Sequence, residues 1–267
     1  MGTAGRGQVT PVRLWVGTSG WQYKDWRDAF YEGRPQRLWL RSYAERFATV
    51  EVNNAFYRLP ERSTFGKWRD EVPDGFVVTV KVSRYLTHIK RLRDPAEPVA
   101  RLLDRAAGLG DRQGPFLLQL PPTLKAAPDL LDACLAEFPP GVRVAVEPRH
   151  DSWWTDEARA VLAAHDAALS WADRKSRSLS PLWAPAGWGY LRLHEGTASP
   201  WPSYGRQALD GWLDRLAEAF PGPGDEAYVY FNNDQGAAAV RDAAHLVARA
   251  EARGIDVPRP APAASPP

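Results

Sequence analysis

The chain has 267 residues, a formal net charge of +2, 12 tryptophans and a single cysteine, Cys134. The near balance of charge excludes a protein that holds polyanions by bulk charge, and one cysteine excludes an intramolecular disulfide and an all-cysteine zinc site. No apolar run approaches the roughly 20 residues of a membrane span, and the N-terminus lacks the apolar core of a signal peptide. We therefore expect a cytoplasmic protein with no membrane partner.

Short apolar or β-branched runs alternate along the chain with segments of helical periodicity. The predicted strands are Val12–Val16, Thr49–Asn53, Phe76–Val82, Phe116–Leu120, Val142–Glu147, Ala168–Trp171, Gly189–His194 and Ala227–Phe231. The predicted helices are Gln36–Phe47, Thr64–Asp70, Pro98–Leu109, Pro128–Phe138, Trp153–His165, Gln207–Phe220 and Gly236–Arg253. This alternation is typical of βαβ units, and eight units in about 250 residues favour an α/β fold with a single (β/α)8 TIM-like barrel.

The organisation along the chain predicts one domain, residues 12–256. The segment 174–187, between strands six and seven, contains two prolines and is expected to be irregular instead of helical. Residues 1–11 and 257–267 are rich in Gly, Ala and Pro, so we expect disordered tails there.

Alternation within the strands separates an apolar face from a second face that becomes polar. In the third strand Val78 and Val80 share one face, while Thr79 and Lys81 share the other. In a barrel this second face points inward, and its carboxyl end forms the mouth where active sites lie. The polar residues at the strand ends are therefore expected to line a site.

The expected site combines acids, bases, amides and aromatic rings from many strands. The candidate catalytic residues are Glu147, Asp173 and His194, with Glu147 as general acid/base and His194 or Asp173 as its partner. The candidate ligand-binding residues are Trp21, Tyr23, Glu51, Asn53, Tyr57, Lys81, Gln119, Arg149, Arg192, Asn232 and Asn233. In this set, cations would clamp an anion, amides would orient hydroxyl groups and aromatic rings would stack. The alternative for Glu147 is a structural ion pair with Arg149.

The histidines and carboxylates also raise the question of a metal. His150 and His194 with Glu51, Glu147 and Asp173 could supply the ligands for a divalent ion. However, the chain contains no close-spaced pair such as H-x-H or H-E-x-x-H, so we expect a metal-free site and no cofactor, with a divalent metal as the alternative. No nucleotide-binding fingerprint occurs either.

Basic residues gather in two predicted mouth loops. Arg84, Lys90, Arg91 and Arg93 follow strand three, and the segment 174–177 follows strand six. This clustering favours a small anionic ligand such as a phosphorylated sugar, or a nucleic-acid backbone, while the alternative is pairing with neighbouring acids. Eight tryptophans also fall near the predicted mouth: Trp21, Trp26, Trp153, Trp154, Trp171, Trp183, Trp188 and Trp201.

Several motifs resemble the YecE-like family, also called domain of unknown function 72. The matching segments are Gly17–Trp26, Phe30-Tyr31, Glu51–Pro60, Phe76–Ser83, Leu118–Pro122, Val146–Trp154, Tyr190–His194 and Val229–Asp234. The resemblance implies a TIM-like barrel but no established activity. A kinship with endonuclease-IV-like barrels would imply metal-assisted phosphodiester chemistry, for which this sequence lacks the many histidines of a trinuclear zinc site. The chain also reads His194-Glu-Gly196 where the family commonly has His-Gly.

These observations lead to one main hypothesis and two alternatives. The main hypothesis is an enzyme acting on an anionic or phosphorylated carbohydrate-like ligand at the barrel mouth. The alternatives are a barrel that binds or processes nucleic acid and a non-catalytic sensor of small molecules.

Overall fold

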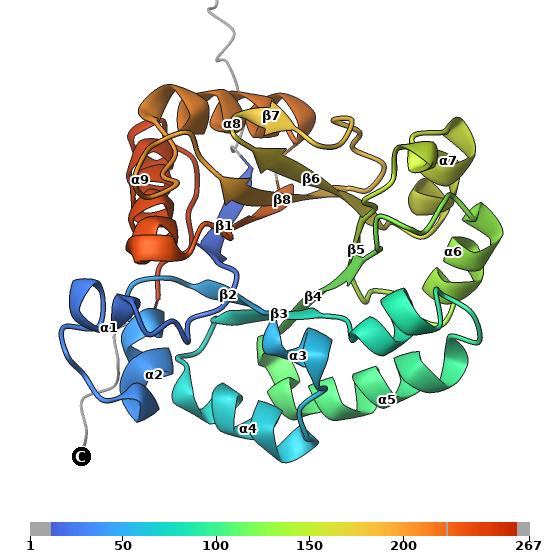
Figure 1. Ribbon diagram of the computed structural model, residues 1–267, viewed down its shortest axis with the longest axis horizontal. Helices are drawn as coiled ribbons and strands as arrows, with labels where there is room; N and C mark the ends of the chain where they lie inside the picture. The colour runs from blue at the N-terminus through green and yellow to red at the C-terminus, as the bar shows by residue number, and fades with distance from the viewer. Residues whose placement is uncertain (1–11, 223, 261–267) are drawn as a thin grey trace, which may run out of the picture.

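Eight parallel strands curl around a common axis with helices outside them (Figure 1). The computed structural model describes residues 12–222 and 224–260. The parallel strands are β1 (Arg13–Thr18), β2 (Thr49–Val52), β3 (Val77–Lys81), β4 (Gln113–Gln119), β5 (Val144–Glu147), β6 (Ala168–Arg174), β8 (Trp188–Glu195) and β9 (Glu226–Phe231). Their order, β1-β9-β8-β6-β5-β4-β3-β2, is that of a nearly closed TIM-like barrel, as predicted.

The seam between β1 and β2 closes the barrel without a regular ladder. The described backbone joins these strands by one isolated parallel bridge, Ser19 to Glu51. The Tyr43 hydroxyl fills the remaining gap, since it accepts from Thr18 N at 2.8 Å and donates to Thr49 O at 3.1 Å. Gly17 permits the close approach, because a Cβ there would lie 2.2 Å from Thr49 O.

The helices cover the outside of the barrel. They are α1 (Trp26–Ala29), α2 (Trp39–Ala44), α3 (Asn54–Tyr57), α4 (Arg62–Glu71), α5 (Ala96–Ala106), α6 (Pro128–Leu135), α7 (Asp156–Ala164), α8 (Arg206–Ala219) and α9 (Ala238–Ala252). Local signals explain their starts: Pro128 opens α6, and the Thr155 side chain caps α7 by accepting from Ala158 N at 3.2 Å. Cys134 is buried in α6, as the helical reading of its position predicts.

The connection between β6 and β8 contains no helix in the structure, which confirms the predicted irregular segment. Instead β7 (Arg177–Ser178) turns back antiparallel to β6. Lys175 and Ser176 form the two-residue turn with φ values of 55° and 59°, typical of a type I′ hairpin.

Two apolar cores flank the sheet. The larger core packs the outward strand residues against the helices. The smaller fills the lower barrel interior and consists of Leu117, Ala145, Ala168, Ala186, Trp188, Tyr190, Tyr228 and Tyr230. The inward face therefore changes from aromatic at the floor to polar at the mouth, as the alternation predicts.

The two expected tails fall largely outside the described residues. Residues 1–11 and 261–267 are not described. Of the remaining tail residues, Val257 packs against the larger core, and Arg259 pairs with Glu251 at 2.6 Å. Among the described helices, none has the length and apolar character needed to cross a membrane.

Candidate functional site

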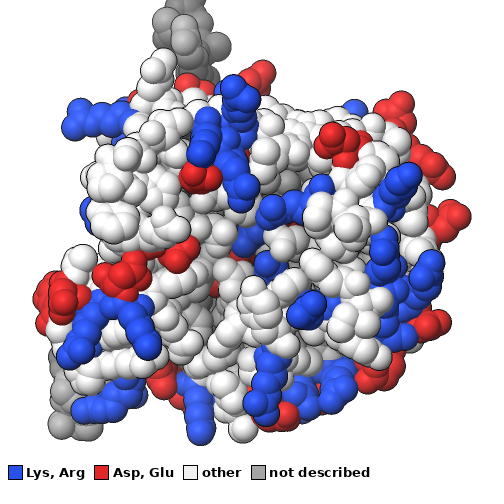
Figure 2. Space-filling model, viewed as in Figure 1, with Lys and Arg blue, Asp and Glu red and all other residues white. Residues whose placement is uncertain are grey.

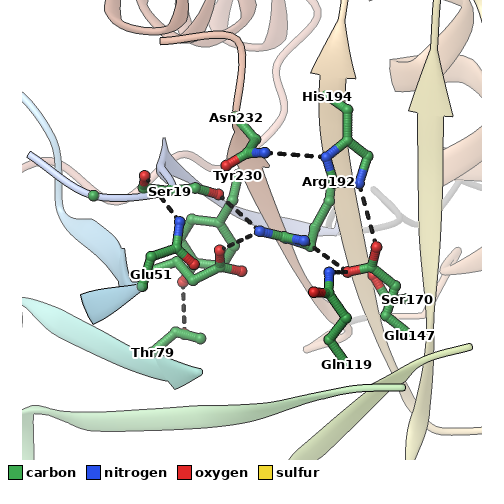
Figure 3. A network of polar contacts seen from close by, with 12 residues as sticks. Ser19, Glu51, Thr79, Gln119, Glu147, Ser170, Arg192, His194, Tyr230 and Asn232 are labelled. Carbon is green, nitrogen blue, oxygen red and sulfur yellow. Dashed lines mark hydrogen bonds and ion pairs between the residues drawn. The ribbon is translucent and has the colours of Figure 1, made fainter. Parts of the chain in front are cut away.

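A buried ion network lies across the barrel where the aromatic floor ends (Figure 3). Arg192, on the inward face of β8, is only 1% exposed. Its guanidinium donates to Glu51 Oε1 on β2 at 2.8 Å and to Glu147 Oε2 on β5 at 2.7 Å. One cation therefore links two carboxylates from opposite parts of the sheet.

Both carboxylates have further partners. Glu51 also accepts from the Tyr190 hydroxyl at 2.5 Å. Glu147 accepts from Gln119 Nε2 at 3.2 Å and pairs with Arg149. Burial by itself would raise the pKa of Glu147, but the Arg192 and Arg149 guanidiniums outweigh burial and hold this pKa well below its usual range. Glu147 is therefore a fixed carboxylate anion at neutral pH.

His194 follows Arg192 by two residues on β8, so it shares the inward face and extends the network toward the mouth. Its Nε2 lies 3.3 Å from Glu147 Oε1, and its Nδ1 lies 3.2 Å from Asn232 Nδ2. The contacts with Glu147 and Asn232 are consistent when Nε2 carries the proton and Nδ1 accepts from the amide, and the 3.3 Å approach of Arg149 Nη2 to Nε2 is then not a hydrogen bond. Burial lowers the pKa of His194 despite its contact with Glu147, so the ring is a neutral imidazole at neutral pH.

Lys81, at the inward carboxyl end of β3, lies beside this network. Its Nζ is 4.3 Å from the centroid of the Phe56 ring. The imidazole of His88 packs edge-on against the same ring, with 4.9 Å between centroids. His88 belongs to a single π-helical turn, Tyr85–Ile89, of the kind that often occurs at functional sites.

A cavity of about 340 Å³ opens next to these groups. It is lined by His88, Gln119, Leu120, Pro122, Pro148, Arg149, Asp151, Trp154, Ala172 and Leu179. Arg149 Nε, on its wall, is buried and has no hydrogen-bond partner among the described residues. The Arg149 side chain as a whole is 27% exposed, so a ligand acceptor in the cavity can reach its exposed part although Nε is enclosed.

Positive charge marks the same end of the barrel. Figure 2 shows Lys and Arg atoms gathered at and around the centre of the face that carries α3 and the β7 hairpin. Some of the predicted loop cations are neutralised: Lys90 pairs with Asp94 at 3.1 Å, and Lys175 pairs with Glu195 at 3.2 Å. Lys81 has no such partner in the described residues, so the excess charge lies at the centre.

Most of the predicted site residues do converge. The structure brings together Glu51, Asn53, Lys81, Gln119, Glu147, Arg149, Arg192, His194, Asn232 and Tyr23. Asn53 Nδ2 and the Tyr23 hydroxyl both donate to Ser19 O, at 3.1 and 2.5 Å. Tyr23 packs against Trp26 with 4.7 Å between centroids, so its ring is part of the loop packing.

Two predicted polar residues, Asp173 and Asn233, lie outside this group. Asp173 shares the outward face of β6 with Trp171, and it accepts from Ser176 N at 3.2 Å to hold the β7 hairpin. Asn233 donates to Asp242 of α9 at 2.7 Å. Strand parity explains both, since each residue is an odd step from the inward positions of its strand. The predicted roles of Asp173 as acid/base partner and Asn233 as hydroxyl ligand are corrected accordingly.

The aromatic residues also differ from prediction. Trp21 is buried and packs edge-on against Trp68, with 5.4 Å between centroids, so it offers no free face. Tyr57 is 74% exposed on α3 and lies outside the cavity. Of the eight tryptophans expected near the mouth, only Trp154 lines this cavity, and Trp188 belongs to the floor core. Most of the others pack between the sheet and its covering segments.

The expected metal ligands are separated. His150 accepts from Ser152 N at 3.1 Å outside the network, and Asp173 faces outward. Glu51 and Glu147 remain, but Arg192 lies between them and would repel a cation. Among the described residues, no three His, Cys, Asp or Glu side chains gather into a possible metal site.

The predicted site residues do not include His88, Trp154 or Asp151, which line the cavity. His88 falls within the predicted loop of cations after strand three, and Trp154 is predicted only as one of the mouth tryptophans. The signal for His88 was its sequence distance of seven residues from Lys81, just after the same strand. The π turn that returns it to Phe56 has no comparable sequence signature.

The comparisons with known proteins agree with this architecture. The family model for proteins of unknown function DUF72 matches residues 15–266. The chain belongs to the DUF72 family. A DUF72 family protein of Thermotoga maritima is similar in structure, with a TM-score of 0.78 and 24% identity over 90% of this chain and 99% of its own. One from Enterococcus faecalis has a TM-score of 0.73 and 18% identity over 87% and 94%. No curated protein sequence matches the chain significantly.

Proposed function

We propose that this DUF72 protein is an enzyme that acts on an anionic, carbohydrate-like ligand bound at the carboxyl end of its barrel. The observation that carries the proposal is the guanidinium side chain of Arg149, which is 27% exposed and lies in the wall of the 340 Å³ cavity. A guanidinium N–H is a strong donor to phosphate or carboxylate oxygens. The cavity has room for a small ligand of sugar size.

The other walls of the cavity suit the uncharged part of such a ligand. Trp154 and Leu179 provide apolar surface, and the half-buried Trp154 ring can pack against a sugar face. Gln119 and Asp151 provide hydrogen-bonding groups for hydroxyls. This mixture of one apolar wall and a few polar groups is typical of ligand sites.

Proton transfer is assigned to His194 instead of Glu147. Both oxygens of Glu147 are engaged by Arg192, Arg149, Gln119 and His194, and its depressed pKa keeps it ionised. It therefore acts as a positioning residue that fixes the His194 tautomer, in the way that carboxylates orient catalytic imidazoles. The remaining lone pair of the neutral imidazole, on Nδ1, is held by Asn232, so the ring acts as a base when the ligand displaces that amide.

The proposal is tested by binding and then by ligand fate. Titration with glucose 6-phosphate, inorganic phosphate and glucose, followed by protein NMR, should show the tightest binding for the sugar phosphate. Arg149→Met should weaken phosphate binding about 10-fold or more, because a charge-assisted hydrogen bond is lost. Arg41→Met, which removes an exposed arginine of α2, is the matched control and should leave binding unchanged.

Two outcomes would redirect the proposal. Equal affinity of wild type and Arg149→Met for phosphate would remove the anion site. Sugar phosphates that bind at Arg149 but are recovered chemically unchanged, across aldose and ketose forms, would favour the sensor over the enzyme.

The nucleic-acid alternative has one supporting feature of its own. Tyr57 and Tyr85 are 74% and 47% exposed beside the mouth cations, where unstacked bases could pack on them. This alternative predicts that a single-stranded oligonucleotide binds at low salt and dissociates as salt is raised. The double variant Tyr57→Ala, Tyr85→Ala should abolish that binding while leaving phosphate binding intact.

A further inference from the structure

Lys81 differs from every other lysine of the chain. The sequence contains six lysines. Lys24, Lys67 and Lys125 are exposed, while Lys90 and Lys175 lie within ion-pair distance of Asp94 and Glu195. Lys81 is mostly buried, and no carboxylate or hydrogen-bond acceptor in the described residues partners its Nζ.

The surroundings of Lys81 disfavour its ammonium form. The two nearby carboxylates, Glu51 and Glu147, are already committed to Arg192. Burial, with added repulsion from Arg192 and Arg149, lowers the pKa of Lys81 to about 8, although Glu51 and Glu147 partly oppose the shift. A substantial share of Lys81 therefore carries a free lone pair at mildly alkaline pH. Lysines desolvated beside another cation are activated as nucleophiles in this way.

We infer that Lys81 is a nucleophilic amine that forms a Schiff base with the carbonyl group of an anionic ligand held in the barrel mouth. The inference rests on the proposed function for the anion site and specifies its ligand as an aldehyde or ketone carrying phosphate or carboxylate. Arg149 takes the anionic group in the cavity. Lys81 lies next to the cavity lining, on the Phe56 ring that His88 also contacts, and meets the carbonyl from the end of β3.

The step balances without any further reactant. The neutral Nζ attacks the carbonyl carbon and forms a C–N bond while the carbonyl π pair moves to oxygen. Transfer of one proton from nitrogen to that oxygen gives a carbinolamine. Protonation of the hydroxyl and loss of water, driven by the nitrogen lone pair, then yield the protonated imine. Overall, lysine ammonium and carbonyl give iminium and one water.

His88 is placed to carry the proton in this step. It contacts the same Phe56 ring as Lys81, and its Nδ1 is engaged by Thr87 Oγ1 at 2.8 Å. Burial and the nearby cations Lys81, Arg84 and Arg149 lower the pKa of His88, so its imidazole is neutral and can accept a proton from Nζ. It also lines the cavity that holds the anion.

The test is reductive trapping on the full chain. The probe is pyridoxal 5′-phosphate with sodium cyanoborohydride, and tryptic peptides report which lysine carries the reduced adduct. We expect labelling of Lys81 at least about 10-fold faster than that of Lys125, because burial beside two guanidiniums favours the neutral amine at Lys81. The rate should rise with pH and reach half its maximum near pH 8.

Matched reagents and variants complete the experiment. Pyridoxal, which lacks the phosphate, should label Lys81 about 10-fold more slowly. Lys81→Arg and Lys81→Met should lose the adduct, and Lys90→Arg should keep it. Because the peptide map of the wild-type protein gives the primary readout, the test does not depend on either Lys81 variant folding.

The possible results separate the two proposals. Labelling spread evenly over the six lysines, with phosphate binding intact, overturns the Schiff-base inference and leaves the anion site in place. If the wild-type protein shows neither preferential labelling of Lys81 nor phosphate binding, the proposed function is overturned as well. Equal labelling of Lys81 by pyridoxal and its phosphate contradicts an anionic ligand, and therefore contradicts both.

Discussion

The floor and the mouth of this barrel have different hydrogen-bond balances although they share the same strands. At the floor, the Tyr230 hydroxyl lies 2.7 Å from both Thr49 Oγ1 and Thr79 Oγ1, so its polar groups are satisfied internally. At the mouth, Arg149 Nε and Asn53 Oδ1 are buried without partners. Unpaired buried groups cost stability, so the comparison supports the proposal that the mouth binds a ligand while the floor serves folding.

Substitutions in the Arg192 ion network, which lies between the floor and the mouth, should have the largest effect on stability. Arg192→Met leaves two buried carboxylates without their common cation, and we expect a loss of about 4 kcal/mol in the free energy of unfolding. Urea denaturation measures it, with Arg41→Met as control. Adding Glu51→Gln and Glu147→Gln should recover much of the loss. A loss below about 1 kcal/mol would show that water enters this layer.

Glu147→Gln should lower the free energy of unfolding somewhat less, by about 3 kcal/mol at pH 7. The amide keeps the shape of the side chain but loses the charge that pairs with the two arginines. The folded-state pKa of Glu147 is depressed, so its ionisation contributes stability that is full above the ordinary glutamate pKa of 4.5. This contribution disappears as pH falls through the folded-state pKa. Denaturation curves from pH 7 to pH 3 should therefore show the two proteins converging below pH 4.5, and a constant difference would contradict the assignment.

Tyr230→Phe tests the floor and should cost about 2 kcal/mol, because Thr49 and Thr79 would lose their shared partner inside the barrel. Tyr57→Phe removes the same hydroxyl from a side chain that is 74% exposed, and it should leave stability unchanged. Thermal unfolding of the two variants distinguishes them. Neither variant should alter phosphate binding, since neither residue lines the cavity.

Lys81→Met should change stability least, and it should raise the free energy of unfolding instead of lowering it. The folded-state pKa of Lys81 lies below its ordinary 10.5, so holding the ammonium costs stability below about pH 8, and the cost fades as pH rises toward 10.5. Loss of the contact with Phe56 offsets part of the gain. We expect Lys81→Met to be about 1 kcal/mol more stable at pH 7 and equal to wild type near pH 11. Destabilisation at pH 7 would identify Lys81 as structural.

Periodicity predicted the eight strands and the inward position of Arg192, because alternation is a local property of the sequence. The same alternation places Asp173 on the face of Leu169 and Trp171, but the predicted strand ends at Trp171 whereas β6 continues to Arg174. The pairing of Arg192 with both Glu51 and Glu147 could not be predicted, since those contacts span 141 and 45 residues. Likewise, nothing local indicates that Phe56 and His88 meet.

The Tyr43 seam has a consequence for how this protein behaves in concentrated solution. In hydrogen-bonding terms the sheet is a ribbon with two edges, β1 and β2, and free edges of this kind can pair with strands of other molecules. Here each edge blocks the other, and the Tyr43 hydroxyl pairs with Thr18 N on one edge and Thr49 O on the other. Tyr43→Phe would leave those groups unsatisfied, so the barrel would become more prone to self-association as well as less stable.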